Sequence, residues 1–126
     1  MSDLATIADG FESVGNGLRP TGSIHDYRHD PIVYYMRMDR LIKIGTTTNI
    51  CMRAGAIMPQ GVLAVEWGAR IEEGRRHAEF WSDYSHGEWF WLREPLWAHI
   101  QSLRETAEDR LGLTTEAWLE KWGVRQ

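Results

Sequence analysis

Tyr34 and Lys43 are residues whose types could together carry proton transfer. They lie in residues 32–38 and 41–45, two short apolar, β-branched and aromatic runs that predict two strands joined by a turn at Asp39-Arg40. A two-residue turn places Tyr34 and Lys43 on one face of this hairpin as diagonal neighbours. A phenol beside an ammonium can handle protons, because neighbouring groups tune the acidity of both. On these two residues alone, a core aromatic ring and a charge at a sheet edge are the better interpretation.

Arg53 strengthens the chemical interpretation. Residues 49–58 predict a helix with a threonine at 47 or 48 as its N-cap, and Ile50, Arg53 and Ile57 share the inward face of that helix. A buried charge is costly without a partner, so this arginine either reaches solvent or points into a polar cleft beside the sheet. Arginine grips a phosphate through two parallel hydrogen bonds, and the free N–H groups at a helix start favour an anion.

The same region is locally basic. Arg37, Arg40, Lys43 and Arg53 lie within it, and Asp39 is its one acid. The candidate nucleic-acid-binding residues are therefore the two hairpin arginines and the polar residues before the helix: Arg37, Arg40, Thr46, Thr47 and Asn49. The whole chain has a net charge of −4, which counts against strong non-specific binding to nucleic acid but not against a local basic patch.

Glu73 and His77 form the next pair, at positions i and i+4 of a second helix predicted over residues 69–84. Its apolar stripe is predicted to be Ile71, Gly74, Ala78 and Trp81, with Gly74 allowing close approach of another backbone. A carboxylate beside this stripe could hold Mg²⁺, and the histidine could serve as a base or as an orienting group. For this helix in isolation, a solvated charged surface is the better interpretation, because Glu72, Arg75 and Arg76 are adjacent.

The remaining pattern predicts an α+β fold. Val62–Trp67 is a third strand, and Gly87–Leu92 is either a short strand or an extended loop. Pro95 begins a helix that Gly112 ends, and residues 114–123 form a short capped helix with Trp118 and Trp122 to bury. We therefore expect a small, mainly antiparallel three-stranded sheet flanked by helices, with extra C-terminal helices.

The 126 residues are enough for one core. We divide them into a loosely structured N-terminal arm (1–30), a module (31–101) and a C-terminal helical extension packed on the same domain (102–126). His25 and His29 stand four apart in the arm, but without a third ligand nearby we interpret them as an ordinary polar segment. The single cysteine excludes an internal disulfide and a cysteine-cluster zinc site. No apolar stretch approaches the roughly 20 residues of a membrane span, so the expected location is the cytoplasm.

The motifs resemble those of the GIY-YIG nuclease superfamily. Ile32-Val33-Tyr34 stands where that family has GIY, and Lys43-Ile44-Gly45 stands where it has YIG. Arg53 follows eight residues after this glycine, the spacing of the family's arginine. The stretches "IEEGRRHAEF" (71–80) and "HGEWF" (86–90) resemble a phage and bacterial branch of the family. The resemblance covers about residues 31 to 100.

This resemblance implies hydrolysis of a DNA phosphodiester with a single Mg²⁺ or Mn²⁺, by a phage or mobile-element protein in a bacterial cell. It implies Glu73 as the metal ligand, and as catalytic residues Tyr34, Lys43, Arg53 and His77. Two departures stand beside it. Lys43 replaces the tyrosine of YIG, and the chain's asparagines, Asn16 and Asn49, do not supply the one that many members carry at the end of the module.

The alternative is a catalytically weak or inactive module on the same fold. The acidic net charge and Lys43 favour this interpretation, in which the protein binds DNA or a host protein without cleavage. The C-terminal helices are then the surface for a host-protein partner or a homodimer, since aromatic residues such as Trp118 and Trp122 are enriched at interfaces. Core packing is the better interpretation of these two tryptophans.

Overall fold

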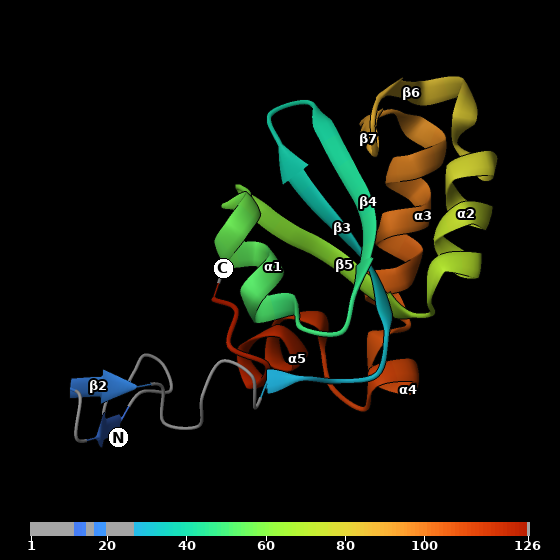
Figure 1. Ribbon diagram of the computed structural model, residues 1–126. Helices are drawn as coiled ribbons and strands as arrows, with labels where there is room; N and C mark the ends of the chain where they lie inside the picture. Colours follow the sequence, from blue (N-terminus) through green and yellow to red (C-terminus); the bar gives the residue numbers. More distant parts are fainter. Residues whose placement is uncertain (1–11, 15–16, 20–26, 126) are drawn as a thin grey trace.

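The fold is α+β, as predicted, and it is built around one antiparallel sheet (Figure 1). The computed structural model describes residues 12–14, 17–19 and 27–125. The sheet has the order β5-β3-β4-β7-β6, with bounds Ile32–Met38 (β3), Leu41–Thr47 (β4), Gly61–Trp67 (β5), Tyr84–His86 (β6) and Trp89–Trp91 (β7). In the N-terminal arm, β1 (Glu12–Val14) pairs with β2 (Gly17–Arg19). The rest of that arm up to residue 26 lies outside the described residues.

The central hairpin has the predicted register. Met38 pairs with Leu41 and Tyr34 pairs with Gly45, so Tyr34 and Lys43 share a face. Asp39 takes the left-handed conformation that the tight turn requires, with φ 58°. Aspartate tolerates this region better than most residues, which explains a turn without the usual glycine.

The expected three strands are too few. Trp89–Trp91 pairs with Leu41–Lys43, so β7 extends the sheet, and β6 adds a fifth strand beyond it. Phe90 is fully buried opposite Ile42, while the tryptophans on either side of it face the other way. This alternation is what makes the segment a strand rather than the extended loop that the sequence also allowed.

Helices cover the two faces of the sheet unequally (Figure 1). On one face lies α1 (Ile50–Ile57), and on the other lie α2 (Arg70–Glu79) and α3 (Glu94–Glu105). A 3₁₀ turn (Trp81–Asp83), α4 (Ala107–Leu111) and α5 (Thr115–Lys121) complete the described chain. The predicted helix after Pro95 is thus divided near Thr106, and Gly112 ends its second part in the left-handed conformation.

The predicted buried stripe of the second helix is wrong. Ile71 is 68% exposed, Trp81 is 58% exposed, and a side chain at Gly74 would contact nothing within 4 Å. The helix also ends at Glu79, before the predicted Tyr84. The face that α2 turns toward the sheet is polar instead, because the carboxylate of Glu73 is only 13% exposed and His77 contacts β4.

Two apolar clusters, one on each face, hold the sheet. One joins the sheet to α3 and includes Val33, Tyr35, Ile42, Ile44, Ala64, Phe80, Phe90, Leu96, Ile100 and Leu103. The other joins it to α1 and the C-terminal residues and includes Ile32, Tyr34, Met36, Ile50, Val62, Val65, Trp118, Leu119 and Val124. The C-terminal extension therefore completes the second cluster, and Trp118 is buried there rather than available to a partner.

His29 has a structural role at the end of the arm. Its ring packs against Trp118 and Trp122, and its Nε2 accepts a hydrogen bond from the Ile50 backbone N–H at 3.0 Å. This lone pair is therefore occupied. His25, the other member of the predicted polar pair, lies outside the described residues. Among the described helices, none has the length and apolar character to cross a membrane.

Candidate functional site

Tyr34 lies across Gly45 on the neighbouring strand. A Cβ added at Gly45 would come within 2.4 Å of the Tyr34 hydroxyl, so any side chain there would displace the ring. Burial raises the pKa of Tyr34 to about 12; Arg53 acts in the opposite direction, while Glu88 and Glu73 raise it further. The phenol is therefore protonated at neutral pH, and two carboxylates and one arginine act on it electrostatically.

The sheet stops short next to this tyrosine. The Ile44 N–H donates to the carbonyl of Glu88 at 3.0 Å, but the Ile44 carbonyl accepts from Nε2 of His77 at 2.8 Å. In a regular antiparallel ladder, the partner strand would supply both groups. His77 thus replaces a strand amide, and its Nε2 carries the proton. This contact fixes α2 against β4 and makes the histidine an anchor, with Nε2 committed as a donor.

The carboxylates of Glu73 and Glu88 lie close together beside β4, where His77 takes the place of a strand amide. Nε2 of His77 lies 3.5 Å from the Glu73 carboxylate, and Nζ of Lys43 lies 3.2 Å from that of Glu88. Burial raises the pKa of Glu73, and the neighbouring Glu88 raises it further through its charge and a shared hydrogen bond. His77 and Arg70 oppose this rise. Two close carboxylates resist simultaneous ionisation, so a cation between them would be favourable.

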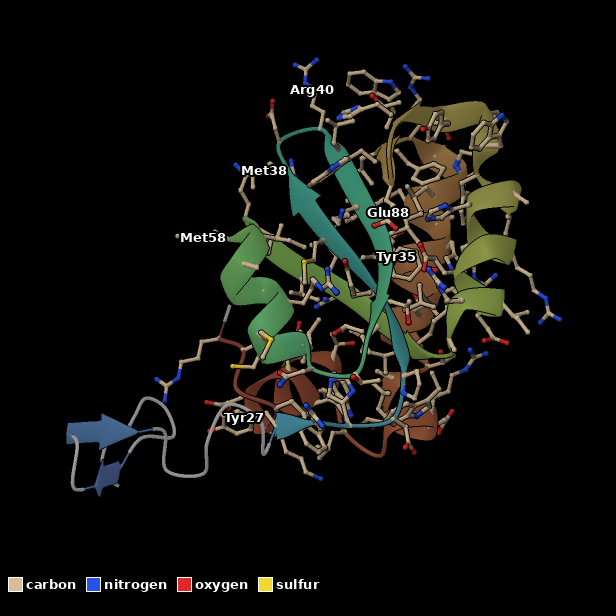
Figure 2. The ribbon with its side chains drawn as sticks, viewed as in Figure 1. Tyr27, Tyr35, Met38, Arg40, Met58 and Glu88 are labelled. Carbon is tan, nitrogen blue, oxygen red and sulfur yellow. The ribbon has the colours of Figure 1, made fainter. Side chains whose placement is uncertain are left out.

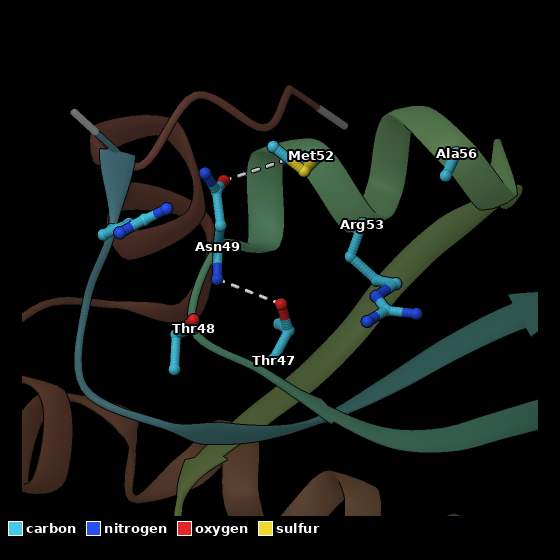
Figure 3. Close-up of a pocket in the computed structure, with 7 residues that line it drawn as sticks. Thr47, Thr48, Asn49, Met52, Arg53 and Ala56 are labelled. Atoms are coloured by element: carbon cyan, nitrogen blue, oxygen red, sulfur yellow. Dashed lines mark hydrogen bonds between the residues drawn. The ribbon is translucent and has the colours of Figure 1, made fainter. Parts of the chain in front are cut away.

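Arg53 reaches the same region from α1. Its side chain extends from the helix toward the strands (Figure 3), and it is exposed rather than buried on the inward face. It lines two cavities, of about 360 and 340 Å³, that meet at Thr47 and Thr48. Arg28 lines the first and Arg70 the second. Arg53 is therefore open to solvent and also borders these polar cavities, so neither of the two predicted alternatives is excluded.

The polar residues before α1 form hydrogen bonds with backbone groups at the start of this helix and on β3. Asn49, not a threonine, is the N-cap, and its Oδ1 accepts from the Met52 N–H at 3.0 Å (Figure 3). Thr47 Oγ1 accepts from the Asn49 N–H, and Thr46 Oγ1 donates to the Ile32 carbonyl. Both threonines nevertheless line the cavity beside Arg53, so they remain candidates for contact with a ligand.

The candidate residues separate into two groups. Tyr34, Lys43, Arg53, Glu73 and His77 come together around the gap beside β4. Arg37 and Arg40 do not join them, because they line a separate cavity at the turn end of the hairpin. Figure 2 shows Arg40 at this turn, whereas Glu88 lies beside β4, away from the turn.

Sequence reasoning gave no site role to Glu88, Arg28 and Arg70. The Glu88 side chain forms an ion pair with Lys43 and acts electrostatically on both Tyr34 and Glu73. Its place opposite Ile44 follows from the pairing of β7, which the sequence left undecided. Arg28 lies in the segment interpreted as a loose arm, so no pattern pointed to its position beside Arg53.

The carboxylates of this site suit a divalent metal ion only in part. Mg²⁺ and Mn²⁺ bind through one or two carboxylates, with water and substrate phosphate completing the coordination. Glu73 and Glu88 supply two neighbouring carboxylates, and the raised pKa of Glu73 indicates a site short of positive charge. Among the described residues, no three acid, histidine or cysteine groups are arranged as a complete protein cage. The residues therefore fit a metal that shares its coordination with a substrate.

A second charged cluster lies where α2 meets β3, β5 and α3. Glu66 accepts from the Tyr35 hydroxyl at 2.5 Å and from two nitrogens of Arg76 at 2.8 and 2.9 Å. Nε2 of His99 lies 2.9 Å from the same hydroxyl. Burial alone would raise the pKa of Glu66, but hydrogen bonds from His99, Arg76 and Tyr35 lower it to about 2. Every member of this cluster has a partner, so it behaves as part of the framework.

Comparison with known proteins gave no match among protein-family models, curated proteins or solved structures.

Proposed function

We propose that the protein is a metal-dependent DNA endonuclease of the GIY-YIG type, acting in the cytoplasm of a bacterial cell and encoded by a phage or mobile element. The observation that carries the proposal is the convergence of Tyr34, Arg53 and Glu73, from a strand and two helices, around one gap beside β4. A carboxylate whose pKa is raised by burial and by a neighbouring carboxylate is typical of functional sites rather than of frameworks.

In this proposal, Arg53 binds the scissile phosphate. Within the described residues, no carboxylate forms an ion pair with it, so its guanidinium is available to two phosphate oxygens. Arg28 and Arg70 line the cavities on either side and contact the neighbouring phosphates. Three arginines along one path offset the acidic net charge locally.

Tyr34 orients the attacking water through its hydroxyl. Its phenol keeps its proton at neutral pH, because burial and two carboxylates raise the pKa. The proton leaving the water passes to the Glu88 carboxylate, whose Lys43 partner then faces the phosphate as a second cation. His77 positions Glu73 through its bond to the Ile44 carbonyl.

Of the two carboxylates, Glu73 is the one that would hold Mg²⁺ or Mn²⁺, because Glu88 accepts the proton of the water in this scheme. A bound divalent ion supplies charge neutralisation at the phosphate and lowers the pKa of a coordinated water. Glu73 is the better placed of the two, because its side chain is only 13% exposed and, among the described residues, no lysine pairs with it, whereas Glu88 pairs with Lys43.

Conversion of supercoiled plasmid to nicked or linear forms tests the proposal. We expect activity with Mg²⁺ or Mn²⁺, none with EDTA, and a loss of at least about 100-fold for Glu73→Ala and Arg53→Ala, as is usual when a key electrostatic group is removed. Arg75→Ala is the matched control, because that side chain is 73% exposed on the same helix as Glu73 and pairs only loosely with Glu72. Equal activity in all four proteins would exclude this site.

A non-cleaving module is the second candidate, and the Lys43–Glu88 ion pair favours it. This pair replaces the second tyrosine of the motif and ties up a carboxylate that the chemistry needs. A metal-free gel shift with DNA separates the two functions. Binding that survives Glu73→Ala, together with inactivity of the wild-type protein in every divalent metal, would support the module that only binds. Retention of a host protein without any DNA shift would point to the protein-binding form of that module.

A further inference from the structure

A strip of tryptophan side chains runs away from the candidate site along β7. Trp89 and Trp91 flank the buried Phe90, so both project from the face of the sheet that carries Tyr34 and Lys43. Two residues along one strand separate the rings by roughly 7 Å. Within the described residues, neither tryptophan belongs to the two buried clusters, and Trp91 is 38% exposed.

The strip begins at the site itself. Nζ of Lys43 lies 5.4 Å from the Trp89 ring centroid and 3.2 Å from the Glu88 carboxylate. Because Glu88 immediately precedes Trp89 and touches both Lys43 and Glu73, the first ring borders the proposed reaction centre.

The strip ends in a basic cavity. A space of about 350 Å³ at the turn end of the hairpin is lined by Arg37, Arg40, Trp91, Leu92 and Arg93, and none of the acidic residues that the structure describes lines it. The guanidinium of Arg93 lies 5.7 Å from the Trp91 ring and also approaches Asp83 at 3.4 Å, while most of its side chain remains exposed. An exposed aromatic face edged by three guanidinium groups offers stacking together with anion binding.

Bases within a duplex are poorly suited to stack on such a surface. In a duplex, the faces of the bases are covered by their neighbours, whereas an unpaired base can stack on an aromatic ring while its phosphate contacts arginine. The spacing of Trp89 and Trp91 suits successive bases of an extended strand. Charge complementarity and the exposed Trp91 ring therefore favour one occupant, an unpaired stretch of DNA.

We propose that Trp89 and Trp91, with Arg37, Arg40 and Arg93, form a stacking platform for unpaired nucleotides adjoining the scissile phosphate. If the proposed nuclease function holds, the platform makes DNA with a single-stranded segment, such as a flap or a bubble, the substrate class. To this extent the inference rests on the proposed function. The platform itself binds without metal, because it lies outside the carboxylate pair.

Fluorescence anisotropy with a labelled oligothymidine and with a blunt duplex, both in EDTA, tests the platform. We expect Trp91→Ala to weaken single-strand binding about 5- to 150-fold, the usual effect of losing one stacked base, and to leave duplex binding unchanged. Arg40→Ala should reduce the slope of log affinity against log salt by about 0.7 for the single strand. Trp81→Ala is the matched control, because Trp81 is also exposed but stacks on Tyr84 outside this strip.

The outcomes keep the two proposals apart. Single-strand binding that depends on Trp91, in a protein that cleaves nothing, would retain the platform and overturn the nuclease. Metal-dependent cleavage of intact duplex, with equal single-strand affinity in wild type, Trp91→Ala and Trp81→Ala, would retain the nuclease and overturn the platform. Circular dichroism of each variant confirms that any lost affinity does not reflect unfolding.

Discussion

Two charged clusters meet the same helix, α2, and they are built in opposite ways. Arg76 joins the first cluster, in which Glu66 is 5% exposed and receives hydrogen bonds from three side chains. Glu73 joins the second, in which its main neighbour is another carboxylate, Glu88. The pKa of Glu66 is lowered to about 2, whereas burial and Glu88 raise the pKa of Glu73.

This difference in pKa distinguishes a carboxylate that stabilises the fold from one suited to a chemical role. A buried carboxylate with a full set of donors is stabilised as an anion and holds neighbouring elements in place. A buried carboxylate beside another one is destabilised until a cation arrives, and such tension is characteristic of functional sites. Because Arg76 and Glu73 are three residues apart on α2, the satisfied cluster fixes the helix that carries the strained one.

The largest expected effect is on the satisfied cluster. Glu66→Gln removes the charge that pairs with Arg76, and breaking a largely buried pair from one side should lower the free energy of unfolding by about 3 kcal/mol. Glu79→Gln is the control, because Glu79 pairs with the same arginine but at the surface, and should cost about 0.5 kcal/mol or less. Urea unfolding measures both. Equal losses would mean that the two clusters do not differ in the way described.

The same variant has a defined dependence on pH. The pKa of Glu66 is lowered from 4.5 to about 2 on folding, so its stabilisation is complete above about pH 4.5 and is lost as the pH falls toward 2. The difference in unfolding free energy between wild type and Glu66→Gln should therefore be constant near neutral pH and shrink over that acidic range. A difference that grew on acidification would contradict the assigned direction of the shift.

A smaller effect of opposite sign is expected at the strained cluster. Glu73→Gln removes one of two repelling carboxylates, so without metal it should raise the free energy of unfolding by about 0.5 to 1 kcal/mol at pH 7. Because the pKa of Glu73 is raised on folding, this gain should disappear as the pH falls and the wild-type carboxyl takes up its proton. Thermal unfolding with and without Mn²⁺ completes the test: the ion should raise the Tm of wild type but not of the variant. If Glu73→Gln instead lowered the free energy of unfolding, Glu73 would stabilise the fold in the same way as Glu66.

The sequence predicted the hairpin and much of the helical part well, because these features depend on local signals. Alternating apolar residues and the short turn determine the register from Tyr34 to Gly45. Thr114 caps α5 by accepting from the Ala117 N–H, as the pattern before the last helix indicated. Each of these features is determined by residues fewer than about a dozen positions apart.

The failures arose where distant residues decide the outcome. The stripe of Ile71 and Trp81 had the period of a buried face, yet the pairing of Arg76 with Glu66 and of His77 with Ile44 turns the opposite face of α2 toward the sheet. Polar contacts across the sheet thus overrode hydrophobic periodicity. The strand character of β7 likewise depends on its pairing with Leu41–Lys43, more than 40 residues earlier. The local sequence of β7 does not indicate this partner.

The hydrogen bond from His77 to the Ile44 carbonyl limits how many residues the turn between β6 and β7 can contain. The turn between β6 and β7 contains Gly87, in the left-handed conformation with φ 54°, and Glu88. Extra residues there that continued the ladder along β4 would compete with the imidazole for the Ile44 carbonyl and close the gap over Gly45. Surface turns usually accept insertions, but in this one the length of the connection determines whether the site is open.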